Sequence, residues 1–89
     1  MKVELFGMAR ALAGFSHVEL ALDEPVALCD FLRALGDAVP ALIPDVIAPA
    51  VDALVEPNLL LLDGRRALRD GETFGDADRP CILFLASGG

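Results

Sequence analysis

The chain has 89 residues, 55% of them hydrophobic, and a formal net charge of −7. This length suffices for one modest hydrophobic core and excludes two, and the composition excludes a disordered chain. The excess of acid argues against nucleic-acid binding, which needs clustered Lys and Arg, and favours basic partners.

Two segments near the N-terminus alternate apolar and polar residues, as half-buried strands do. They are residues 2–6 and 17–22. Val3 and Leu5 of the first should face the core. The segment between them, 7–15, is either a loop or carries a short helical turn at 10–12.

Residues 23–37 predict the main helix of the domain. Asp23 or Glu24 can cap its start, and Pro25 fits the first turn, where a missing N–H costs little. Gly36 can supply a left-handed stop at its end. An apolar stripe at helical spacing should pack across the sheet. The stripe consists of Leu28, Phe31, Leu32 and Leu35.

The second half of the chain predicts a connector, a hairpin, a loop and a last strand. Prolines prevent one long helix between 37 and 57, so we expect a connector over the core. Residues 58–68 predict a hairpin around an Asp63-Gly64 turn, and 69–80 a polar loop. The last strand, 81–85, is apolar on both faces, which suits an interior position in the sheet.

This order of elements predicts the α+β class and a β-grasp fold. We expect a mixed sheet of four to five strands, one main helix and short helical turns, in a single domain spanning residues 1–89.

The remaining polar residues point to no metal or cofactor site. Cys29 and Cys81 form no CxxC pair and have apolar neighbours, so we expect both to serve in packing rather than in zinc binding or persulfide chemistry. His17 should face solvent, and the acids in 70–78 lack the spacing of a calcium loop. Since no signal peptide or membrane span is visible, we expect a cytoplasmic protein.

The end of the chain is a short run of small residues. Only four residues follow the last strand: Ala86, Ser87, Gly88 and Gly89. Glycine lacks a Cβ and fits narrow channels, and four extended residues span at most roughly 13 to 14 Å. We therefore expect 86–89 to be a flexible tail that inserts into partner enzymes.

Several motifs resemble those of the MoaD/ThiS family of ubiquitin-like sulfur carriers. They are the opening "MKVELFGMARALAG", the helix "VALCDFLRAL", the hairpin "LLLLDGRRAL", the "RDGET" stretch and the C-terminal Ser-Gly-Gly. Together they cover nearly the whole chain. The MoaD type, the small subunit of molybdopterin synthase, is the most similar. Two departures are Asp63, where the family usually has Asn, and Leu85-Ala86, where it often has paired prolines.

The resemblance implies a chemistry for the tail. An E1-like adenylyltransferase of the MoeB or ThiF type would adenylate Gly89 with Mg-ATP, and a sulfur donor would convert it to a thiocarboxylate. The sulfur would pass to a MoaE-type large subunit in molybdopterin (molybdenum cofactor) biosynthesis. The chain itself would be non-catalytic and bind no cofactor.

Two alternatives remain open. The chain could carry sulfur for another pathway, such as thiamine thiazole, tRNA thiolation or cysteine. It could also be a β-grasp interaction module or protein modifier without sulfur chemistry.

Any enzyme that receives Gly89 must contact the surface around the tail. Phe6, Leu60 and Phe84 are candidates for an apolar partner interface on the outer face of the sheet. The alternative that these residues belong to the core stays open, because the sequence does not say which face the helix covers.

Overall fold

The computed structural model describes residues 1–84. Leu85, the predicted end of the last strand, and the predicted tail, 86–89, lie outside the described residues. The strands are β1 (Lys2–Leu5), β2 (His17–Glu19), β3 (Val26–Ala27), β4 (Asn58–Leu62), β5 (Arg66–Ala67), β6 (Thr73–Phe74) and β7 (Cys81–Phe84). The helices are α1 (Met8–Ala13) and α2 (Leu28–Ala38), with 3-10 turns η1 (Pro40–Leu42) and η2 (Asp76–Asp78).

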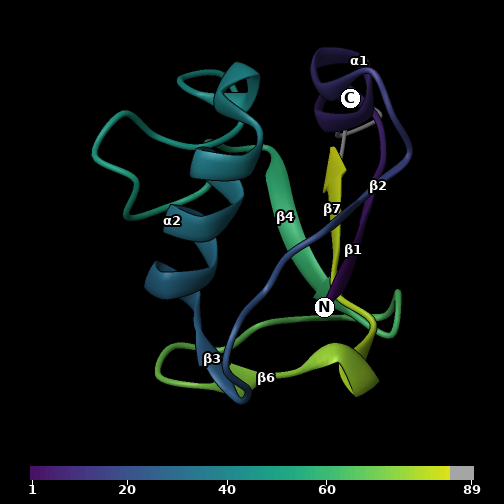
Figure 1. Cartoon of the computed structure of the whole chain (residues 1–89), viewed down its shortest axis with the longest axis vertical. Helices are drawn as coiled ribbons and strands as arrows, with labels where there is room; N and C mark the ends of the chain where they lie inside the picture. The colour runs from purple at the N-terminus through teal and green to yellow at the C-terminus, as the bar shows by residue number, and fades with distance from the viewer. Residues whose placement is uncertain (85–89) are drawn as a thin grey trace.

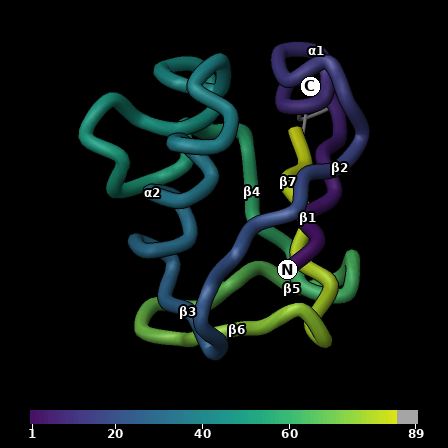
Figure 2. The backbone as a smooth tube through the Cα atoms, in the orientation of Figure 1, coloured from purple at the N-terminus to yellow at the C-terminus, as the bar shows by residue number. Residues whose placement is uncertain are grey.

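Five strands form one mixed sheet in the order β2-β1-β7-β4-β5, and β3 pairs with β6 separately. β7 is central: it runs parallel to β1 and antiparallel to β4. The long helix α2 stands beside the sheet, and α1 lies at the end toward which β7 runs (Figure 1, Figure 2). The β-grasp fold and the interior position of the last strand are thereby confirmed.

The core lies between α2 and one face of the sheet. Leu5, Ile82 and Leu60 occupy one row across β1, β7 and β4, and all three are buried. From the other side, Phe31 of α2 meets the ring of Phe74 edge-on, with centroids 5.1 Å apart and planes at 68°. Each such buried side chain stabilises the fold by about 1.5–3 kcal/mol.

The main helix begins later than predicted. Residues 26–27 form β3, in which Val26 pairs with Phe74, so α2 starts at Leu28. Within residues 1–84, no side chain caps this start. The predicted cap Glu24 instead accepts a hydrogen bond from the Asp76 backbone N–H at 2.6 Å. Tertiary pairing therefore overrides the local helix-start signal.

Gly36 is not the left-handed stop that the sequence predicted. It lies inside α2, which continues to Ala38, and it is buried. A Cβ at this position would lie 3.1 Å from the Ile43 side chain. Glycine is used here because the connector after α2 packs closely against the helix.

The predicted hairpin is confirmed. Asp63 and Gly64 have φ angles of 56° and 67°, as both central residues of a type I′ turn require. The Arg65 N–H donates to the Leu62 carbonyl at 3.1 Å and closes the turn. The resulting hairpin pairs β4 with β5.

The 7–15 segment carries a helix, α1, which confirms the helical one of its two predicted alternatives, although α1 is longer than the predicted turn at 10–12. Two other segments differ in detail from the prediction. The second strand ends at Glu19, although Leu20 stays buried. Residues 69–80 are not a plain polar loop, because they contain β6, whose Phe74 is 1% exposed. Within the described part of the chain, no helix has the length and hydropathy needed to cross a membrane.

Candidate functional site at the open sheet face

The face of the sheet opposite the core is the candidate site. Strand alternation places Glu4, Cys81 and Leu61 in one row across β1, β7 and β4 on this face. Leu59 and Leu83 form the next row and are half-buried. We call this surface the open face, since its charged residues are exposed and α2 covers the other side.

The three residues predicted as a partner interface do not share this face. Phe6 alternates with Leu5 and lies on the open face, where it is 40% exposed. Leu60 is 4% exposed and belongs to the core, which is the alternative that the sequence left open for these residues. Phe84 comes two residues after Ile82 in β7 and therefore faces the core side of the sheet. There it pairs with Asn58 and is half-buried.

Sequence reasoning missed two exposed apolar residues, one in α1 and one before β2. Leu12 of α1 is 37% exposed and Phe15 is 46% exposed. With Phe6, they are the exposed large hydrophobics of residues 1–84. The Leu5 N–H donates to the Ser16 carbonyl at 2.8 Å, which continues the β1–β2 register and brings Phe6 next to Phe15. We call Phe6 and Phe15 the corner patch.

The corner patch adjoins the end of β7. The Phe6 N–H donates to the Ile82 carbonyl at 2.9 Å. Gly7 has φ 64° and ψ −129°, and a Cβ there would lie 2.7 Å from the Phe84 Cβ. This close approach of the chain before α1 to the end of β7 needs a residue without a side chain. The end of β7 therefore lies beside Phe6 of the corner patch.

Cys81 is buried on the open face, at 7% exposure. Burial, together with the Glu4 carboxylate, raises the pKa of the Cys81 thiol. The thiol therefore stays protonated at neutral pH and is a poor nucleophile, which agrees with a packing role.

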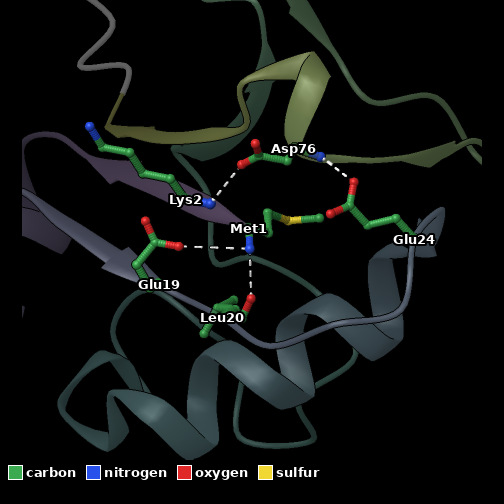
Figure 3. A network of polar contacts seen from close by, with 6 residues as sticks. All are labelled: Met1, Lys2, Glu19, Leu20, Glu24 and Asp76. Atoms are coloured by element: carbon green, nitrogen blue, oxygen red, sulfur yellow. Dashed lines mark hydrogen bonds and ion pairs between the residues drawn. The ribbon is translucent and has the colours of Figure 1, made fainter.

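Two acidic residues of the 70–78 segment, Glu72 and Asp76, link it to other parts of the chain. Asp76 accepts a hydrogen bond from the Lys2 N–H at 2.9 Å, and its own N–H binds Glu24 (Figure 3). Glu72 pairs with the Arg66 guanidinium at 2.7 Å. Among residues 1–84, no three His, Cys, Asp or Glu side chains gather in a way that could hold a metal.

Comparisons with known proteins agree with this geometry. No family model matches the chain, and no curated protein does. Among solved structures, the chain is similar to a ubiquitin-like class of β-grasp proteins. The crystal structure of SAMP1 from Haloferax volcanii has 28% identity and a TM-score of 0.79, over 99% of this chain and 97% of that one. A crystal structure of H. volcanii small archaeal modifier protein 1 has 26% identity and a TM-score of 0.77, over 96% and 95%.

A third structure supports the fold alone. The solution structure of the Haloferax volcanii HVO 2177 protein has 21% identity and a TM-score of 0.63, over 99% of this chain and 84% of that one. The full-length likeness to small archaeal modifier protein 1 is thus a likeness in both sequence and fold.

Proposed function

We propose that this chain is a ubiquitin-like carrier whose C-terminal carboxylate, on Gly89, is activated by an E1-like enzyme. The observation that carries the proposal is the full-length similarity to a small archaeal modifier, in a chain that ends in Gly-Gly after the central strand of a β-grasp. The exposed corner patch beside the end of β7 supports it, because an enzyme that binds the residues after β7 would contact the surface near the end of that strand.

The tail needs activation for a chemical reason. A terminal carboxylate has a pKa of about 3.3 to 3.7, so it is ionised at neutral pH and is a poor acyl electrophile. In the proposed step, the Gly89 carboxylate attacks the α-phosphorus of Mg-ATP and releases pyrophosphate, giving an acyl adenylate. The ATP and Mg belong to the activating enzyme, of the MoeB or ThiF type, which performs the catalysis.

The first fate of the adenylate is sulfur transfer. A sulfur donor would displace AMP and leave a thiocarboxylate on Gly89. The acceptor we favour is a MoaE-type large subunit in molybdopterin synthesis, because of the motifs "FGMARALAG" and "LLLLDGRRAL". In this complex the present chain is the sulfur-donating subunit.

A second fate is conjugation to protein. Here a lysine amine would displace AMP and form an isopeptide bond. The similarity to a protein named as a modifier favours this alternative. Both fates share the same first step, so the activation of Gly89 is tested before they are separated.

Substitution of the last residue tests the proposal. Gly89→Val should abolish adenylation and thiocarboxylation, because a branched Cβ does not fit a channel built for glycine. Ser87→Ala, which keeps the tail small, is the matched control and should react like the wild type. Intact mass spectrometry after incubation with an E1-like enzyme, Mg-ATP and a sulfur source gives the readout. Normal thiocarboxylation of Gly89→Val would contradict the proposal.

A further inference from the structure

A hollow of about 230 Å³ lies between the start of α2, the connector and β4. Leucines from four parts of the chain line it: Leu28, Leu54, Leu60 and Leu68. Asn58, the first residue of β4, belongs to the same wall. An apolar cavity of about 150 Å³ is large enough to hold benzene. This hollow therefore has room for one aromatic ring system.

Asn58 carries a hydrogen-bond acceptor that residues 1–84 leave unused. The residue is 2% exposed. Its Nδ2 donates to the Val55 carbonyl at 2.8 Å, but its Oδ1 is buried and accepts no hydrogen bond from the described chain. Most buried polar atoms in proteins have a partner, because an unpaired one is destabilising. A molecule that brings an N–H or O–H to Oδ1 through the hollow would satisfy it.

A second hollow, of about 330 Å³, adjoins the first, since Leu28 and Leu68 line both. Its charged lining residues are three acids and one cation: Asp52, Asp70, Glu72 and Arg69. Glu72 already pairs with an arginine, whereas Asp52 and Asp70 are exposed and form no ion pair within residues 1–84. The apolar hollow thus has an acidic neighbour. We call the two hollows together the β4 groove.

The chemistry of the β4 groove selects the side chain that fits it. Leucines favour an apolar body, and the unpaired Oδ1 of Asn58 requires a donor. A Lys or Arg side chain would supply the donor but place a charge among leucines, at a large cost in desolvation. Tyr and Trp combine an aromatic body with a polar donor. Trp fits best, because its indole N–H is a donor only and buries no further acceptor.

We propose that the β4 groove docks a partner protein, which inserts a Trp side chain against Asn58 and places a neighbouring Lys or Arg beside Asp52 and Asp70. A free aromatic molecule would fill the first hollow and leave the two acids without a partner, whereas a protein segment uses both. The net charge of −7 also favours a basic partner. The corner patch lines neither hollow, so this is a separate surface. The inference does not depend on whether Gly89 is activated.

Two peptides that differ in one group test the hydrogen bond. One is N-acetyl-Lys-Trp-Lys-amide, and in the other 3-benzothienylalanine, in which sulfur replaces the indole N–H, takes the place of Trp. Titration of the ¹⁵N-labelled full chain by NMR gives both Kd values, and the shifted amides locate the site. We expect the Trp peptide to bind roughly tenfold more tightly, with shifts centred on residues 52–60 and 68–72. Because the chain has no Trp or Tyr, indole fluorescence gives an independent Kd.

Three protein variants test the two ends of the β4 groove. Asn58→Leu removes Oδ1, so the two peptides should bind it equally; the peptide comparison on the wild-type chain stands even if this variant does not fold. Asp70→Lys should weaken the Trp peptide roughly fivefold at low ionic strength. Asp37→Lys, the matched control, reverses an exposed acid of α2 that lines neither hollow, and should stay within about twofold of wild type.

The outcomes are distinguishable. Equal Kd values of the two peptides for the wild-type chain, or shifts centred outside the β4 groove, would overturn the inference. Free indole that binds as tightly as the Trp peptide would overturn the choice of a protein occupant, because the lysines would then contribute nothing. None of these results bears on Gly89, whose activation is tested separately by mass spectrometry.

Discussion

Gly7→Ala tests whether the close approach of Gly7 to Phe84, at the end of β7, requires a residue without a side chain. The backbone at Gly7, with φ 64° and ψ −129°, is a conformation that costs a residue with a side chain about 1–3 kcal/mol. The added Cβ would also meet the Phe84 Cβ at 2.7 Å, and such overpacking costs about 1–3 kcal/mol more. We expect a total loss of about 2–6 kcal/mol, a large share of the roughly 5–15 kcal/mol typical of a domain.

Gly14→Ala is the matched control at the other end of α1. Its φ of 85° and ψ of 4° are left-handed, and apart from its chain neighbours no atom of residues 1–84 would lie within 4 Å of an added Cβ there. The control should cost only the backbone strain, about 1–2 kcal/mol. Urea denaturation midpoints at constant m-value measure both losses. Equal losses for the two variants would refute the reasoning, because the contact with Phe84 would then contribute nothing.

Three further predictions concern buried and paired polar groups. Asn58→Asp should lower the free energy of unfolding by about 3 kcal/mol or more at pH 7, and by less once acid protonates the new carboxyl. The reason is that Asn58 is 2% exposed and its amide donates to the Val55 carbonyl. Equal stability of the variant and the wild type by urea denaturation would contradict this. Hydrogen bonds from the Arg66 side chain and the Arg69 N–H lower the pKa of Glu72 from 4.5 to about 2. Its stabilising contribution is thus present above about pH 4.5 and lost toward pH 2, so the midpoint difference between wild type and Glu72→Gln should shrink over that range. Iodoacetamide should alkylate exposed Cys29 well before buried Cys81 in the native protein, and equal rates by peptide mapping would argue against a packed Cys81.

The features predicted correctly are those that depend on local sequence. The alternation in residues 2–6 assigns Val3 and Leu5 to the core, because the side-chain period of a strand is two. Asp63-Gly64 specifies its turn through residues that accept positive φ. The two-sided apolar character of the last strand predicts its central position.

The helix boundaries depend on residues distant in sequence. β3 exists only because Val26 pairs with Phe74, and a two-residue strand leaves no periodic signal. Gly36 fits the local rule for a helix stop, but its role comes from the contact with Ile43. At both places a local signal for the end of a helix is overridden by tertiary packing.

The candidate interface shows the same limit. A continuous run of leucines in β4 has no alternation, so the sequence cannot say whether Leu59 or Leu60 faces the core. Only the register with β7 decides this. Likewise, nothing local marks Leu12 and Phe15 as exposed, although their apolar character beside the β1–β2 connection is visible in the sequence.

Intact mass spectrometry of the wild-type protein tests the central claim most directly. The protein is incubated with an E1-like enzyme, Mg-ATP and a sulfur source, and a parallel sample lacks ATP. The account predicts that one oxygen of Gly89 is replaced by sulfur only when ATP is present. An unchanged mass with several such enzymes, each active on its own carrier, would contradict the claim that Gly89 is an activated sulfur-bearing end.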